Sequence, residues 1–365
     1  MKFAYQWHGR LGWLLAPLLA IQALSGAVLL WMQPLPAPQE SPPPAVQAWT
    51  KAVDQGLAEL ASRYPTAKFE YVNLPGKADA PVSVRLLASE SNESGWADID
   101  TVDGTAGTLR PDSSQERTLL YGLHERLLLA DVGPWVLRAI ALTALVLVAM
   151  GLRVWWRMRH LPPRTPWRRL HRLIGPVFVL PVAMMLVTGF VLRSPEWASA
   201  AMSAWPGQAA AAPSVAAPAA SGPQTATLGQ ALAAAATALP QARPMRIYPP
   251  RNGQVRVRMR GDEWHPIGLN NVFVSAADAS VLRVVRAAEQ PLSVRYLNVV
   301  YPLHLGTLPG TPGLAGALVA RVLWTLLALA LAGLALTGAV QRFRTKAKTQ
   351  TTSRKQVECN EIQPQ

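Results

Sequence analysis

Four long apolar segments constrain the fold of this chain more than any other feature of its sequence. They cover residues 11–32, 134–156, 172–193 and 318–341. About 20 apolar residues are enough for a helix to cross the roughly 30 Å hydrocarbon core of a bilayer. Each segment reaches that length, so the sequence predicts four transmembrane helices.

The composition agrees with a membrane protein. Half of the 365 residues are hydrophobic, only 15% are charged, and the mean hydropathy is +0.15. Soluble proteins carry about a quarter of charged residues, so an ordinary soluble enzyme and a disordered chain are both disfavoured. The first apolar run exceeds the core of a signal peptide, about 7–15 residues long. We therefore interpret it as a retained helix and not as a cleaved signal.

Lysine and arginine predict the orientation of the helices, because cytoplasmic loops are enriched in both. Lysine and arginine are concentrated in three segments outside the apolar runs, namely residues 1–10, 157–171 and 342–365. We expect both termini in the cytoplasm, in the inner membrane of a bacterium, with two large periplasmic segments, 33–133 and 194–317. Much of the net charge of +14 then reflects orientation, and no nucleic-acid partner is indicated.

The two periplasmic segments show the same predicted order of elements, one helix followed by β-strands. Two stretches rich in proline or alanine, Pro34–Pro44 and Gln208–Pro223, are interpreted as linkers. A turn is expected at Val102-Asp103-Gly104. The expected elements are a helix near 47–63 with strands near 69–74, 81–87 and 96–101, then a helix near 228–239 with strands near 245–248, 254–260, 271–275 and 281–285.

Short motifs repeat along the apolar segments. His8 precedes Ser25-Gly26 by 17 and 18 residues, and His171 precedes Thr188-Gly189 by the same numbers. The first segment thus has a counterpart in the third, which indicates an internal duplication.

The second and fourth segments also correspond. Tyr121-Gly-Leu-His124 precedes one and Tyr301-Pro-Leu-His304 precedes the other, while Asn73 aligns with Ile247 in the periplasmic segments. Such a repeat implies a pseudo-two-fold axis along the membrane normal. The predicted fold class is an integral membrane α-helical protein, a four-helix transmembrane bundle with two periplasmic α+β domains, internally duplicated.

These motifs resemble those of the PepSY-associated transmembrane helix family. The resemblance rests on a His-x-x-x-Gly sequence opening a helix that closes with Ser/Thr-Gly, followed by a helix-plus-strands segment, and it extends to about Arg344. It implies PepSY-type periplasmic domains. It also implies a role like that of the iron-uptake membrane reductases that act on ferric siderophores in the periplasm.

Histidines are the candidate metal ligands. The single cysteine, Cys359, excludes a disulfide framework, a cysteine-based zinc site and an iron–sulfur cluster. His8 pairs in the prediction with His171, and His124 with His304, as the axial ligands of two bis-histidine haems b, one near each membrane face. The alternative is that these histidines lie near lipid headgroups and bind nothing.

Other candidate residues are less specific. Arg256, Arg258 and Arg260 alternate with apolar residues, so one strand presents a basic face. This face is suited to an anionic ligand or a phospholipid headgroup, or it is simply solvated. His160 is expected to be solvated, with the alternative that it replaces a cytoplasmic ligand, and His265 is expected at the surface in a turn.

These features predict a membrane oxidoreductase. Electrons from a quinol or a separate cytoplasmic reductase would cross the bilayer, and the family resemblance implies that they reduce an Fe(III)-siderophore in the periplasm and release Fe(II). One alternative is a non-enzymatic PepSY scaffold that binds a partner protein. Another is a haem reductase with a different periplasmic acceptor. No dinucleotide fingerprint or Walker loop occurs in the sequence.

Overall fold

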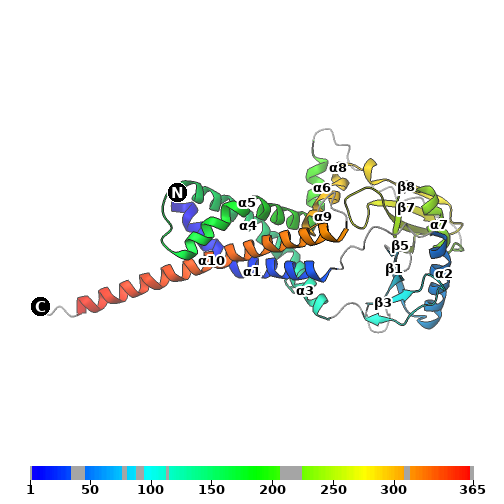
Figure 1. Ribbon diagram of the computed structural model, residues 1–365, viewed down its shortest axis with the longest axis horizontal. Coiled ribbons are helices and arrows are strands. Elements are labelled where there is room, and N and C mark those ends of the chain that lie inside the picture. The colour runs from blue at the N-terminus through cyan, green and yellow to red at the C-terminus, as the bar shows by residue number, and fades with distance from the viewer. Residues whose placement is uncertain are drawn as a thin grey trace. The chain divides into compact units, whose positions relative to one another are not determined.

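The computed structural model describes residues 2–33, 46–75, 80–87, 94–111, 115–205, 224–307 and 313–361. Both predicted linkers lie outside these residues. The chain forms two compact units, each of which combines distant parts of the sequence (Figure 1). The first, called the membrane unit, contains residues 1–34, 116–194 and 318–365, and the second, called the sheet unit, contains residues 35–115 and 195–317.

Four helices of the membrane unit are long and apolar enough to cross a bilayer, as the sequence predicts. A shorter helix, α3 (Gln115–Arg126), precedes the second of them. The four long helices are α1 (Lys2–Met32), α4 (Gly133–Met158), α5 (Pro166–Arg193) and α10 (Gly313–Glu361).

Small and apolar residues fill the interior of this helix bundle. Ala16, Ala144, Val182 and Leu327 belong to one buried cluster that joins all four long helices. Alanines at such contacts let helix backbones approach closely. On the outside, Leu180 is 78% exposed, which is the expected state of a side chain that faces lipid.

The helices extend beyond the apolar runs from which they were predicted. Thr165 caps α5 by accepting a 3.2 Å hydrogen bond from the backbone N–H of Arg168, and Pro166 occupies the first turn. Helix α5 therefore begins before residue 172, and His171 lies inside it. Helix α10 likewise continues into the predicted tail, because no glycine or proline follows residue 342 until Pro364.

The sheet unit is built on one antiparallel sheet with the strand order β4-β3-β2-β1-β5-β6-β7-β8. The predicted strands are confirmed with shifts of at most a few residues, and the short β4 is an addition. The strands are β1 (Lys68–Asn73), β2 (Val82–Leu87), β3 (Ser94–Ile99), β4 (Arg110–Pro111), β5 (Arg243–Arg251), β6 (Gln254–Arg260), β7 (Asn270–Ser275) and β8 (Val281–Val285).

The two segments that were predicted to be periplasmic meet at the pairing of β1 with β5. Val72 lies opposite Ile247, and Asn73 lies opposite Arg246. In the repeat alignment Asn73 corresponds to Ile247, and Val72 therefore corresponds to Arg246. Replacing each residue by its counterpart turns the pair Val72–Ile247 into the pair Arg246–Asn73, and the reverse. That reciprocity is what a two-fold axis between β1 and β5 requires. Strands of both segments thus share one sheet.

Two helices, α2 (Val46–Arg63) and α7 (Leu228–Ala238), pack against each other over one face of the sheet (Figure 1). A β-carbon at Gly229 would meet the carbonyl oxygen of Thr50 at 2.4 Å, so only glycine permits this close approach. Asp54 accepts a 2.7 Å hydrogen bond from the backbone N–H of Gly229. Trp49 is 1% exposed in the core beneath these helices.

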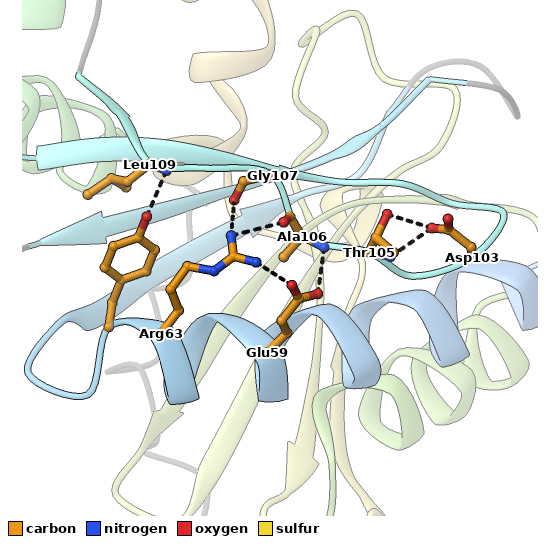
Figure 2. Close-up of polar contacts among 8 residues, drawn as sticks. Glu59, Arg63, Asp103, Thr105, Ala106, Gly107 and Leu109 are labelled. Atoms are coloured by element: carbon orange, nitrogen blue, oxygen red, sulfur yellow. Dashed lines mark hydrogen bonds and ion pairs between the residues drawn. The ribbon is translucent and has the colours of Figure 1, made fainter.

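The end of α2 is attached to the turn between β3 and β4, as Figure 2 shows. The guanidinium of Arg63 donates to the carbonyl oxygens of Ala106 and Gly107, each at 3.0 Å. Glu59 accepts a 2.8 Å hydrogen bond from the N–H of Ala106. Gly104 has a φ of +75°, which confirms the predicted turn and explains its glycine.

Short helices complete the sheet unit. Helix α9 follows the strands of the second repeat, and its last residue is His304. These elements are α6 (Pro195–Ser203), a 3₁₀ turn (Ala287–Glu289), α8 (Leu292–Arg295) and α9 (Leu297–His304).

Candidate functional site

Two of the predicted ligands, His8 and His171, lie next to each other inside the membrane unit. His8 belongs to α1 and His171 to α5, the two helices that the repeated sequence motifs matched to each other. Their ring centres are 6.2 Å apart, and the ring planes are inclined by 71°. The structure therefore brings together the pair that the sequence assigned to one site.

Hydrogen bonds fix the tautomer of both rings. The Nδ1 atom of His8 lies 3.1 Å from the carbonyl oxygen of Leu147, which can only accept, so Nδ1 carries the proton. The Nδ1 atom of His171 lies 3.0 Å from the hydroxyl oxygen of Thr337. That hydroxyl donates its hydrogen to the carbonyl oxygen of Gly333 at 2.6 Å, so it accepts from His171. In both rings Nε2 keeps its lone pair.

His124 on α3 is held in the same state. Its Nδ1 atom lies 3.1 Å from the carbonyl oxygen of Gln22 and 3.1 Å from the hydroxyl oxygen of Ser25. The hydroxyl of Ser25 donates to the same carbonyl at 3.2 Å. Burial lowers the pKa of His124, which favours the neutral ring. Again Nε2 is the nitrogen left with a lone pair.

Each of these rings rests on a glycine of another helix. A β-carbon at Gly151 would lie 2.9 Å from Cε1 of His8, and one at Gly26 would lie 2.8 Å from Cε1 of His124. The corresponding distance between Gly338 and His171 is 3.6 Å. Any larger residue at position 26 or 151 would displace the histidine.

One dipeptide pattern builds two of these positions. In Ser25-Gly26 and in Thr337-Gly338 the hydroxyl contacts Nδ1 of the histidine, and the glycine gives room to its ring. The motif Ser/Thr-Gly was recognised from the sequence in the first and third apolar segments. That this motif contacts and positions a histidine ring was not predicted. Thr337-Gly338 could have been found by searching the fourth segment for the same dipeptide.

The His8 and His171 side chains fit the axial ligation of a haem iron. A metal–imidazole bond is about 2 Å long, and the centre of the ring lies about 1 Å beyond the bonded nitrogen. Two axial imidazoles on one metal therefore have their ring centres about 6 Å apart. The observed separation is 6.2 Å, and both rings hold the tautomer that ligation by Nε2 requires. Among the described residues, no group of three or more His, Cys, Asp or Glu could hold a metal ion by itself.

The other two histidines of interest lie elsewhere. His304 ends α9 in the sheet unit, whereas His124 belongs to the membrane unit, so their pairing stays a prediction. His160 is exposed between α4 and α5, and its Nε2 accepts a 3.3 Å hydrogen bond from Arg159. A ligand role for His160 is untested.

The expectation that His265 lies at the surface is wrong. It is 5% exposed, and its ring stacks on that of Tyr301 with the ring centres 4.6 Å apart. Its backbone N–H donates to the side-chain oxygen of Asn298 at 2.9 Å, and its Nδ1 accepts from the N–H of Ile267. Helix α9, which was not predicted, covers the turn and buries the histidine.

The alternation on β6 is confirmed. Val255, Val257 and Met259 are fully buried beneath the helices. Arg256 and Arg260 are exposed and Arg258 is half-buried, as expected for side chains on the opposite face of the sheet.

A comparison with protein families matches residues 5–344 to the PepSY-associated TM region. The chain belongs to this family. The match spans nearly the whole chain and includes all four apolar helices, so the PepSY-associated chain is a multi-pass membrane protein. No curated protein matches its sequence significantly.

Proposed function

We propose that this PepSY-associated protein is a haem-dependent oxidoreductase that reduces Fe(III) held by a siderophore in the periplasm. One quinol would be oxidised to quinone with the release of two protons, and each of its two electrons would reduce one Fe(III) to Fe(II). A separate cytoplasmic reductase is the alternative electron donor. Oxygen ligands of a siderophore hold Fe(II) more weakly than Fe(III), because the softer ion prefers other donors, so reduction releases the iron.

The proposal rests on one observation. His8 and His171 lie next to each other, and the Nδ1 atom of each ring takes part in a hydrogen bond. Two interfacial histidines without a ligand have no reason to meet inside a helix bundle, since burying polar rings is costly unless they serve a function. Here both rings hold Nδ1 in a hydrogen bond, which leaves Nε2 as the nitrogen for ligation, and the ring-centre distance suits one iron between the two rings. The proposed cofactors are two haems b, the second bound through His124 and His304.

The residues around the histidines have defined tasks. A bound bis-histidine haem supplies one-electron exchange without an open coordination position. Leu147 and Thr337 accept the Nδ1 protons and so orient His8 and His171, which also makes Nε2 more basic. The apolar residues of the bundle, such as Ala16 and Val182, exclude water from the site.

The absorption spectrum of the purified protein tests the proposal. We expect a Soret band and split α bands typical of low-spin haem b, and about half of their intensity to be lost when His171 is replaced by Ala, because the second haem is bound elsewhere. The control is Asp262→Ala, because Asp262 is exposed in the sheet unit; His160→Ala is measured beside it, and loss of the bands in that variant would make His160 a ligand. A colourless preparation from haem-supplied cells would contradict the proposal and favour a scaffold without enzymatic activity.

Iron reduction is tested separately in proteoliposomes that contain a quinol. We expect Fe(II) to appear from at least one of a set of Fe(III)-siderophore complexes, and His124→Ala or His304→Ala to abolish its appearance. The haem-loaded protein could instead reduce a small redox protein but none of the ferric chelates. That result would support electron transfer and contradict the assignment of a ferric siderophore as the substrate.

A further inference from the structure

Two pairs of arginines face each other across β5 and β6. Arg243 lies opposite Arg260, and Arg246 lies opposite Arg258. Like charges directly opposite each other on antiparallel strands destabilise a sheet. Burial and the charge of Arg260 lower the pKa of Arg243, as expected for cations on facing positions of paired strands. The sheet therefore carries uncompensated positive charge at this place.

No carboxylate of the described residues forms an ion pair with these four arginines. Their hydrogen bonds go to neutral oxygens, for example from Nε of Arg246 to the side-chain oxygen of Asn73 at 2.7 Å. Nε of Arg258 donates to the carbonyl oxygen of Gly268 at 2.8 Å. Each guanidinium has five N–H donors, so most of them remain available to an anion.

Two tyrosines add flat aromatic surfaces between the arginines. Tyr71 of β1 and Tyr248 of β5 have ring centres 6.1 Å apart. The guanidinium carbon of Arg246 lies 4.1 Å from the centre of Tyr71, and that of Arg256 lies 3.7 Å from the centre of Tyr248. Tyr71 belongs to the first repeat and the arginines to the second, so the surface straddles the line where the repeats meet.

The hydroxyl of Tyr248 is a point on which the charges converge. Burial opposes ionisation of this phenol, but hydrogen bonds from Arg246 and Arg258 and the charges of Arg246 and Arg256 lower the pKa of Tyr248. Guanidinium groups that converge on one oxygen in this way can also donate to the oxygen anions of a ligand, such as those of a catecholate.

The arginines also lie near the helix that ends in His304. The charge of Arg258 acts on His265, and His265 stacks on Tyr301 at 4.6 Å. Tyr301 precedes His304 by three residues on α9, so the two lie on one side of that helix. Within the sheet unit, the basic surface thus lies near the helix that carries His304.

We propose that Arg246, Arg256 and Arg258, together with Tyr71 and Tyr248, bind an anionic iron chelate with flat oxygen donors, of the catecholate or carboxylate class. Paired guanidinium groups match such oxygens in bidentate geometry, and the tyrosines accept the flat rings. The inference rests on the proposed function for the identity of the metal. It narrows the substrate from siderophores in general to anionic ones.

Binding is tested with gallium(III) complexes, which have the same oxygen coordination but are not reduced. Gallium tris-catecholate carries three negative charges, and gallium tris-acetohydroxamate carries none. Both are titrated calorimetrically into the full chain in neutral detergent. We expect the anionic complex to bind about tenfold more tightly or better, and its affinity to fall as salt is raised from about 50 to about 500 mM.

Substitutions assign the binding to this surface. The double variant R246Q/R258Q should weaken the anionic complex by about tenfold or more, since hydrogen bonds to charged groups are the strong ones. The matched control is Arg251→Gln, at the end of β5 and opposite Gln254, which should bind as the wild type does. Because R246Q/R258Q removes like-charge repulsion, its melting temperature should be equal or higher. If the double variant does not fold, Arg256→Gln is used instead to test the same surface, because the side chain of Arg256 is exposed.

Three results would overturn the inference. The two gallium complexes could bind equally well, or the folded R246Q/R258Q protein could keep wild-type affinity. The third is the absence of binding to either complex together with co-sedimentation on phosphatidylglycerol vesicles that R246Q/R258Q abolishes, which would assign the surface to lipid headgroups. None of these measurements uses electron transfer, and a failure of the haem spectrum therefore remains a separate result.

Discussion

The imidazole of His8 packs so closely on Gly151 that a β-carbon there would lie 2.9 Å from Cε1 of the ring. The corresponding glycine under His171, Gly338, leaves 3.6 Å to the same ring atom, which is an ordinary van der Waals distance. The two histidines are therefore alike in hydrogen bonding but differ in how tightly a glycine confines them.

This difference predicts unequal effects of the same substitution. Gly151→Ala should force the His8 ring away from Leu147 and lower the haem bound per protein, whereas Gly338→Ala should retain nearly the wild-type amount. Haem content is measured by the pyridine haemochrome assay on purified protein. Equal haem content in both variants would contradict the assignment of His8 as a ligand held by Gly151.

Thr337→Val should weaken the site at His171. Valine has nearly the shape of threonine but leaves the Nδ1 proton of His171 without its acceptor. Loss of such a partner commonly reduces metal affinity by about 10–100-fold, so we expect faster haem transfer to apomyoglobin and a shifted reduction potential. The control is Thr143→Val, because Thr143 is half-buried and its hydroxyl donates to the carbonyl oxygen of Ala139 in its own helix. Identical transfer rates in the two variants would argue against ligation by His171.

Periodicity and spacing predicted the helices and strands of this protein well. The run from Gln254 to Arg260 alternates strictly and forms β6 with the same bounds. Four apolar runs became four long helices, because length and composition alone decide that outcome. Repeat spacing also paired His8 with His171, since corresponding helices of a duplicated bundle face each other.

The sequence did not predict contacts made by partners distant along the chain. Leu147 accepts from His8 with a backbone carbonyl, and a carbonyl gives no sequence signal. His265 lies in a polar turn, and only the packing of Tyr301 from α9 buries it. The joining of β1 to β5 was likewise not predicted, because edge pairing between two separate segments depends on tertiary structure.

Acid should destabilise the sheet unit through His265. Burial and the charge of Arg258 lower the pKa of His265 from 6.5 to about 4, against the smaller opposing effect of Glu263, and Arg260 adds to the lowering. Between these values the unfolded chain binds more protons than the folded one, so stability falls as the pH falls from about 6.5 toward 4. The slope is at most about 1.4 kcal/mol per pH unit.

The measurement is the apparent melting temperature at pH 7 and at pH 5. The wild-type protein should lose more of it between these two values than His265→Gln does, because glutamine does not titrate. Parallel losses in both proteins would show that other groups govern the acid response.

Asp54 should stabilise the contact between the two repeats. It lies on α2 and accepts 2.7 Å hydrogen bonds from the hydroxyl of Thr227 and the N–H of Gly229, at the beginning of α7. Its negative charge also interacts favourably with the helix N-terminus. Asp54→Ala leaves the N–H of Gly229 without this acceptor, so we expect a loss of about 1–3 kcal/mol. Asp54→Asn keeps one acceptor oxygen and should lose less.

The fluorescence of Trp49, which is 1% exposed on α2, makes the intrinsic-fluorescence melting curve sensitive to this contact. For a unit of this length, each kcal/mol of lost stability lowers the melting temperature by about 2–4 °C. Asp262→Ala is the control, because Asp262 is exposed in the same unit. Asp54→Ala and Asp262→Ala proteins that melt together would mean that the cap at α7 contributes nothing, and that the shared sheet alone holds the repeats together.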